Sequence, residues 1–285
     1  MLKSIASEVL GEEKAREVWS RIDVVGDIAI IKKPLRGSLQ LEDFVKIGER
    51  LVEKVKYINS VWLAASPVEG DHRVRRNLVH LAGEKRTVTV YREHGCAFLV
   101  DVSKVFVTPR LSFEHYRVAR LVRPGEVIVN MFAGAGIFSI VIAKIARPRR
   151  VYSIDINKDA YRLMERNTRL NGVEDIVIPL HGDAAEIVSR MLRGVANRVL
   201  MPLPMLALDY LEYASLALKD RGVIHVYLHV GFDRGENPSR KAVDEVVGRL
   251  EELRLTARKV YARVVRPVGP RRVQVAVDVE VERGG

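Results

Sequence analysis

The stretch Val127–Ser139, VIVNMFAGAGIFS, decides the fold of this chain. A short apolar run typical of a buried strand leads into Gly134 and Gly136, and a second apolar run with helical character follows. Glycine lets the backbone turn sharply, and it leaves room for a ligand that approaches the main chain closely. The stretch therefore predicts a strand, a tight ligand-binding turn and a helix.

Strand-like and helix-like segments keep alternating after this turn. Strands are predicted at 126–130, 151–154, 176–179 and 198–201, followed by helices at 138–146, 160–171, 184–192 and 205–218. Near-continuous apolar strands that alternate with helices are typical of a parallel sheet covered on both faces. A strand at 222–228 and a helix at 238–253 follow, and the runs 257–265 and 272–281 predict an antiparallel hairpin at the sheet edge.

The upstream part of the chain has a different pattern. It predicts a helix over 4–22, two strand pieces within 24–32, a helix around 44–55, a strand at 60–66 and a hairpin within 86–106. The expected architecture is therefore α/β, with a mostly parallel, Rossmann-like sheet in residues 111–285 and a smaller α+β domain in residues 1–110.

Two acidic residues stand at predicted strand ends beside the glycine turn. Asp155 ends the second strand, where an acid can bond both ribose hydroxyls, and Asp183 ends the third, where it can accept from an adenine amino group. A nicotinamide dinucleotide is disfavoured, because Ser139 stands where its motif requires a third glycine. S-adenosylmethionine, which has no phosphate, fits better; the plain alternative is that both acids are merely strand-end caps.

The charge balance points to a polyanionic partner. The 285 residues include 47 Lys and Arg against 36 Asp and Glu, a net charge of +11 that suits nucleic acid. Cys96 is the only cysteine, which excludes a disulfide scaffold and favours the cytoplasm. The sequence shows neither a membrane-spanning run nor a signal peptide, and His225 and His229 lack a third ligand for a metal.

Several segments resemble the archaeal and eukaryal tRNA (guanine-37-N1)-methyltransferases, a class I methyltransferase family. They are VFVTPRLSFEHYRVA, VIVNMFAGAGIFSIVIA, IDINKDAYRLMERNTRLNGV, GDA, RVLMPLP and GVIHVY, and the resemblance covers about residues 73–281. It implies methyl transfer from S-adenosylmethionine to N1 of guanosine 37 of tRNA, with residues 1–110 positioning the RNA. Neither a membrane nor an obligate protein partner is expected.

The resemblance also implies roles for individual residues. Guanine N1 carries a proton at neutral pH, so a general base is required, and the family pattern places it at Glu114. Arg73 or Arg75 would stabilise the charge that develops on guanine O6. The candidate cofactor-binding residues are Phe106, Phe132, Ala133, Gly134, Gly136, Asp155, Ile156, Asp183, Ala184 and Pro202.

Some residues depart from the family pattern. Pro202-Leu203-Pro204 replaces a common Asn-Leu-Pro, Phe106 replaces a common Tyr, and Asn130 replaces a common Asp. Two alternatives therefore stay open. One is the wyosine-pathway aminocarboxypropyltransferase, which uses the same cofactor and fold at the same tRNA position, and the other is a non-catalytic RNA-binding protein with this fold.

Overall fold

The computed structural model describes residues 1–34, 37–65 and 77–283. The chain divides into two compact units, Met1–Pro109 and Arg110–Gly285, each with its own core.

The first unit is a small α+β structure. Its helices are α1 (Leu2–Leu10), α2 (Glu12–Glu17) and α3 (Leu41–Lys54), and its strands are β1 (Asp23–Val25), β2 (Ile28–Lys32), β3 (Ser60–Ala64), β4 (Leu78–Gly83), β5 (Val88–Glu93) and β6 (Cys96–Asp101). The strands β1 to β4 form one sheet in chain order, in which β2 and β3 are parallel, and β5 pairs with β6 as the predicted hairpin. Apolar side chains of α1 and α3 cover this sheet and form the core.

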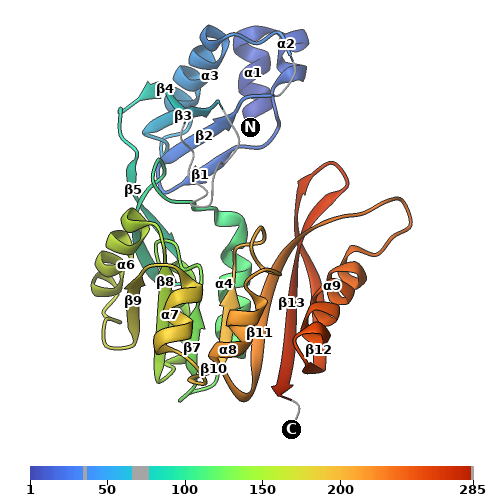
Figure 1. The fold of residues 1–285 in the computed structure, drawn as a ribbon. Helices are drawn as coiled ribbons and strands as arrows, with labels where there is room; N and C mark the ends of the chain where they lie inside the picture. The colour runs from blue at the N-terminus through green and yellow to red at the C-terminus, as the bar shows by residue number, and fades with distance from the viewer. Residues whose placement is uncertain (35–36, 66–76, 284–285) are drawn as a thin grey trace. The chain divides into compact units, whose positions relative to one another are not determined.

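The second unit contains the alternating strands and helices. Its elements are the short 3-10 turn Pro109–Leu111, shared with the end of the first unit, α4 (Ser112–Leu121), β7 (Val127–Asn130), α5 (Ile137–Ala146), β8 (Arg150–Asp155), α6 (Lys158–Leu170), β9 (Val177–His181), α7 (Ala184–Met191), β10 (Ala196–Met201), α8 (Leu211–Ala217), β11 (Leu218–Gly231), α9 (Pro238–Glu252), β12 (Leu255–Gly269) and β13 (Arg272–Arg283) (Figure 1).

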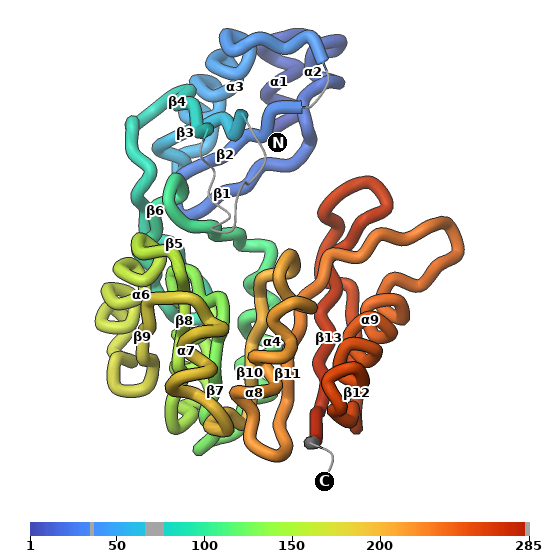
Figure 2. Tube along the Cα trace, viewed as in Figure 1, coloured from blue at the N-terminus to red at the C-terminus, as the bar shows by residue number. Residues whose placement is uncertain are grey.

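The seven strands lie in the order β12-β13-β11-β10-β7-β8-β9. Strands β11, β10, β7, β8 and β9 are parallel, whereas β13 runs antiparallel to both β11 and β12. The long β12–β13 hairpin can be followed along the chain trace in Figure 2. The predicted Rossmann-like sheet with an antiparallel hairpin at its edge is confirmed.

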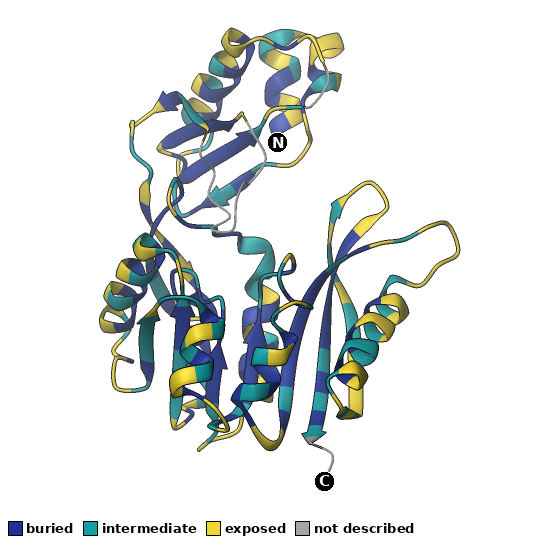
Figure 3. Cartoon of the chain, viewed as in Figure 1, coloured by how far each residue is buried: buried dark blue, intermediate teal, exposed yellow. Residues whose placement is uncertain are grey.

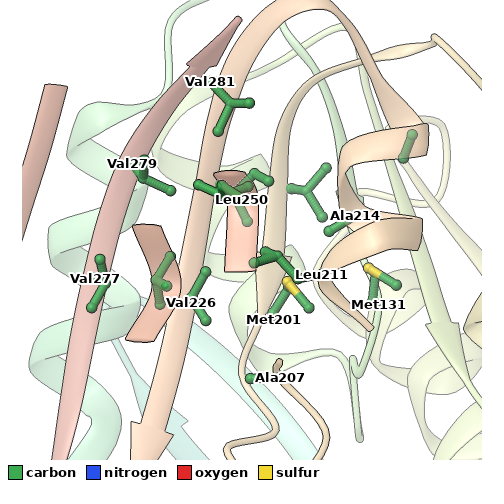
Figure 4. Packing of buried hydrophobic residues seen from close by; sticks show 14 of the residues in the cluster. Met131, Met201, Ala207, Leu211, Ala214, Val226, Leu250, Val277, Val279 and Val281 are labelled. Carbon is green, nitrogen blue, oxygen red and sulfur yellow. The ribbon is translucent and has the colours of Figure 1, made fainter. Parts of the chain in front are cut away.

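Helices cover both faces of this sheet. From β7, the chain moves across the sheet in one direction to β8 and then to β9, and it afterwards returns past β7 to β10, in the opposite direction. Because these crossovers are right-handed, α5 and α6 lie on one face of the sheet and α7 lies on the other. On the α7 face, Leu211 of α8 and Leu250 of α9 pack against Val226 and Val277 of the sheet (Figure 4). The strands are mostly buried while the helices expose their outer faces (Figure 3), which is the burial expected of a layered α/β unit.

Three sequence expectations were wrong in detail. The helix expected over residues 4–22 is broken at Gly11, whose φ of +82° ends α1. The helix expected from Met205 begins only at Leu211, because residues 204–210 form turns after two prolines that lack backbone donors. Trp19, an aromatic residue whose large apolar side chain predicts a core position, is exposed. Among the described residues, no helix has both the length and the apolar character needed to cross a bilayer.

Candidate active site

The order of the strands predicts a ligand crevice at the carboxyl ends of β7 and β10. The chain proceeds from β7 toward β9 on one side and from β10 toward β11 on the other, so the direction of winding reverses between these two strands. Ligands of open α/β sheets bind at the carboxyl ends of the strands at such a reversal. The glycine turn follows β7 and Pro202 follows β10, so both border this position.

The two glycines of the turn have different tasks. Gly134 has a φ of +57°, and a side chain built there would meet open space. Gly136 has a φ of +86°, and its Cβ would lie 2.9 Å from Cγ of Met164 on α6. The first glycine therefore leaves the surface of the turn open to a ligand, and the second allows the start of α5 to pack closely on α6.

Asp155 is fixed beside this turn. Its Oδ2 accepts a hydrogen bond of 2.6 Å from the backbone N–H of Gly134, and its Oδ1 accepts one of 2.9 Å from Asn157. These two bonds orient the carboxylate beside the turn.

Asp183 caps a helix and also contacts Tyr210. Its Oδ1 accepts from the backbone N–H groups of Ala185 at 2.8 Å and Glu186 at 3.2 Å, which is an N-cap of α7. Its Oδ2 accepts from the hydroxyl of Tyr210 at 2.7 Å, and the Tyr210 ring packs edge-on against Phe132 at 5.3 Å. Asp183 therefore has a structural role as the N-cap of α7, and Tyr210 contacts it although the sequence position of Tyr210 carried no signal.

A buried polar cluster connects the helix after the turn with two neighbouring strands. The hydroxyl of Ser139 accepts from Nδ2 of Asn130 at 3.0 Å and from the Ser153 hydroxyl at 2.7 Å, and all three residues are fully buried. The serine at the position of the missing glycine therefore ties α5 to β7 and β8. Polar residues inside apolar runs were the available sequence signal for this cluster.

The other predicted cofactor residues are distributed as follows. Ala133 donates its N–H to the carbonyl of Ile154 at 2.8 Å, Ile156 is exposed after β8, and Ala184 is buried in the first turn of α7. Phe106 belongs to the unit Met1–Pro109 and is half-buried there. Arg73 and Arg75 lie outside the described residues.

Glu114, the predicted base, lies in the first turn of α4 and is only 1% exposed. Its Oε2 accepts from the Tyr227 hydroxyl at 3.0 Å and pairs with the Arg117 guanidinium at 2.9 Å, while Oε1 pairs with Arg263. These partners are all donors and two are cations, so both oxygens of the Glu114 carboxyl group are held in charge-assisted contacts. The pKa of Tyr227 is raised by burial and by the charge of Glu114, which keeps its hydroxyl protonated as a donor.

Behind Glu114, a chain of buried polar groups crosses the sheet. Arg117 binds both oxygens of Asp278, at 2.5 and 3.1 Å, and Asp278 in turn contacts Nδ1 of His225 at 2.6 Å. The guanidinium of Arg198 lies 2.6 Å from His225 Nε2 and also pairs with Glu126. An arginine can only donate, so Nε2 is the acceptor and the His225 proton is on Nδ1, facing Asp278.

The electrostatics agree with this assignment. Burial lowers the pKa of His225, more than the neighbouring Asp278 raises it, so the imidazole is neutral near pH 7. Burial alone would raise the pKa of Asp278, but the neighbouring His225 and Arg117 hold it below its usual range. The network therefore carries a fixed negative charge at Asp278, which anchors Arg117 beside Glu114.

Comparisons with known proteins agree with this geometry. The family described as TRM5/TYW2 methyltransferase domain matches residues 89–260, more than half of the chain. The tRNA 4-demethylwyosine(37)-methyltransferase of Saccharolobus solfataricus is 40% identical over 93% of this chain and 95% of its own length. The tRNA (guanine(37)-N(1))-methyltransferase of Pyrococcus abyssi is 36% identical over 95% of this chain and 77% of its own length.

The structural comparison extends the match to the fold. The solved complex of aTrm5 with tRNALeu superposes with a TM-score of 0.82 at 32% identity, over 98% of this chain and 77% of that one. A shared fold, the two relatives and the family match all lead to the same assignment. This chain belongs to the TRM5/TYW2 family of methyltransferases, and it is an S-adenosylmethionine-dependent enzyme.

Proposed function

We propose that the enzyme transfers the methyl group of S-adenosylmethionine to N1 of guanosine 37 of tRNA. The observation that carries this proposal is the buried carboxyl group of Glu114 on α4, held by cationic and hydroxyl donors, because N1 methylation requires a proton acceptor. The Pyrococcus abyssi relative, named for this activity, and the aTrm5 complex with tRNA support it. The net charge of +11 suits a tRNA partner, and residues 1–110 are proposed to position that RNA.

The reaction requires one proton transfer and one methyl transfer. When bound, S-adenosylmethionine supplies an electrophilic methyl group on a positively charged sulfur. Glu114 accepts the N1 proton and becomes neutral, and the N1 lone pair that this frees would take up that methyl group. Arg117 and Tyr227 hold the carboxylate in place during these steps.

For the cofactor, we propose that the open surface at Gly134 and the carboxylate of Asp155 hold the adenosine moiety. The position of Asp155, tied to the Gly134 N–H at 2.6 Å, puts an acceptor beside the turn that a ligand would approach. Asp183 with Phe132 and Tyr210 would border the adenine, and Pro202 would lie across the crevice from it.

Asp155→Ala is expected to weaken S-adenosylmethionine binding by about 1–3 kcal/mol, because two ribose hydroxyls lose a charged acceptor. Calorimetric titration of the full chain with the cofactor measures this directly. Asp159→Ala, on the first turn of the next helix, is the matched control and should bind as the wild type does. Equal affinities for Asp155→Ala and the wild type would refute the ribose assignment.

A second candidate substrate is 4-demethylwyosine at the same tRNA position. It is favoured by the Saccharolobus solfataricus relative, which is named for that substrate and is matched over 95% of its length. A competition assay with equal amounts of tRNA carrying guanosine and tRNA carrying 4-demethylwyosine at position 37 separates the two. Predominant methylation of the guanosine tRNA supports the first proposal, and predominant methylation of the other supports the second.

The transferred group is tested with two labels. S-adenosylmethionine labelled in the methyl carbon should transfer its label to tRNA, whereas cofactor labelled in the aminocarboxypropyl carbons should not. Transfer of the second label alone would show aminocarboxypropyl transfer, and binding of tRNA without either label would leave an RNA-binding protein.

A further inference from the structure

The two oxygens of Glu114 are held in different ways. Oε2 is held by the buried Tyr227 hydroxyl and by Arg117, whose side chain is mostly covered; both residues belong to the unit Arg110–Gly285. Arg117 is itself bound by both oxygens of Asp278. Moving Arg117 away from Oε2 would therefore also break its pair with Asp278, which makes an exchange of partners at Oε2 costly. Among the described residues, the partner recorded for Oε1 is Arg263.

Arg263 differs from the partners of Oε2 in its surroundings. It lies on β12, which pairs only with β13 among the described strands and so forms an edge of the sheet. Its side chain is 29% exposed, compared with 13% for Arg117. An arginine on an edge strand that keeps this contact with water can leave an ion pair and rehydrate at a lower cost than a more deeply enclosed arginine such as Arg117.

An exposed aromatic residue accompanies this arginine. The guanidinium carbon of Arg263 lies 4.6 Å from the centre of the Phe113 ring, and Phe113, next to Glu114 in the chain, is 60% exposed. Arginine planes and exposed aromatic rings are the groups on which RNA bases stack and to which RNA oxygens bind. The Arg263 side of Glu114 therefore faces solvent with groups suited to RNA.

We propose that Arg263 is an exchangeable partner of Glu114: it covers Oε1 in the free enzyme and transfers its guanidinium to an oxygen of the RNA on binding. The exchange exposes Oε1, which then accepts the N1 proton, while Oε2 keeps its buried partners. The RNA oxygen is a phosphate oxygen or a base carbonyl near nucleotide 37, both of which accept from a guanidinium. Arg263 is thus a positioning residue whose departure makes the base available only when RNA is present. This inference rests on the proposed role of Glu114.

A double-mutant cycle of binding affinities tests the exchange. Glu114→Gln, Arg263→Met and the double variant are each titrated with a tRNA transcript carrying guanosine 37, without cofactor. In the wild-type background, Glu114→Gln should tighten binding by about three- to fivefold, because Arg263 no longer has to leave an ion pair. In the Arg263→Met background the same substitution should change affinity by less than about twofold. Equal tightening in both backgrounds, or none in either, would overturn the exchange.

Arg258→Met provides the matched control. Arg258 lies on the same edge strand and pairs with Glu282. Its loss should weaken binding as any lost phosphate contact would, and Glu114→Gln should still tighten binding in that background. Arg263→Lys keeps a cation that can pair with Oε1, so Glu114→Gln should still tighten tRNA binding in that background, though by less than in the wild type. No tightening with lysine at position 263, together with full tightening with methionine there, would contradict the proposal.

Substrate variants identify the oxygen that receives Arg263. The cycle is repeated with altered tRNA, and the coupling between Glu114→Gln and Arg263→Met is compared. If this coupling survives with an abasic residue at position 37, the acceptor is a phosphate oxygen. If it is lost with 2-aminopurine, which lacks O6, the acceptor is on the base. Both results require the exchange. The proposed function fails separately: a full methyl-transfer rate in Glu114→Gln would remove Glu114 as the base, whereas an inactive Glu114→Gln without coupling would remove only the exchange.

Discussion

Glu114→Gln should slow single-turnover methyl transfer by about 10²–10⁴-fold without loss of cofactor or tRNA affinity. Glutamine keeps the size of the side chain and its ability to accept from Tyr227, but it cannot take up the N1 proton. The transfer rate of the wild type should rise with pH until one group is deprotonated, and that dependence should vanish or shift in the variant. Rapid-quench measurement with saturating enzyme follows the transfer step without product release.

Glu252→Gln is a suitable control for this experiment. Glu252 is an exposed acid at the end of α9 that pairs with Arg249, so its substitution should leave the transfer rate unchanged. If Glu114→Gln transferred at the wild-type rate with the wild-type pH profile, Glu114 would be a helix first-turn acid, and another group would have to accept the proton.

Arg117→Met should lower the free energy of unfolding by about 3–5 kcal/mol at pH 7, because it removes a cation from the buried carboxylate of Glu114 and from the mostly covered carboxylate of Asp278. Asp278 loses the bidentate partner that helps to hold its pKa low, and Glu114 keeps only Tyr227 and Arg263. A carboxylate with a lowered native pKa stabilises the fold above its unfolded-state pKa of about 4 and loses that contribution as the pH falls. The deficit of the variant should therefore narrow below about pH 4. Urea unfolding at several pH values measures it.

Arg249→Met removes an arginine of comparable size from an exposed pair and should cost less than about 1 kcal/mol. Equal effects of Arg117→Met and Arg249→Met on the unfolding free energy would mean that the buried network contributes nothing beyond a surface ion pair.

The sequence predicts the order of the strands and helices well, because the relevant information is local. The stretch after β7 combines an apolar strand, two glycines and an apolar helix, and Gly134 and Asp155 meet in the structure as the motif requires. Element ends are less predictable. Gly11 broke an expected helix through its positive φ, and the start of α8 depended on the turns after Pro204.

The buried network could not be predicted because it depends on strand register. His225 and Asp278 are far apart in the chain, and they meet only because they face each other directly across the antiparallel pair β11 and β13. A shift of one residue in that register would point Asp278 toward the other face of the sheet. The contact of Tyr210 with Asp183 likewise depends on how the loop after β10 folds back, which no local pattern encodes.

The central claim is methyl transfer to N1 of guanosine 37, and mass analysis of nucleosides from treated tRNA tests it most directly. An unmodified transcript with guanosine 37, incubated with the enzyme and S-adenosylmethionine, should yield N1-methylguanosine, and mapping of nuclease fragments should place it at position 37. A transcript with adenosine at that position should yield none. Absence of N1-methylguanosine from the guanosine transcript, with methylation of tRNA carrying 4-demethylwyosine under the same conditions, would contradict the claim.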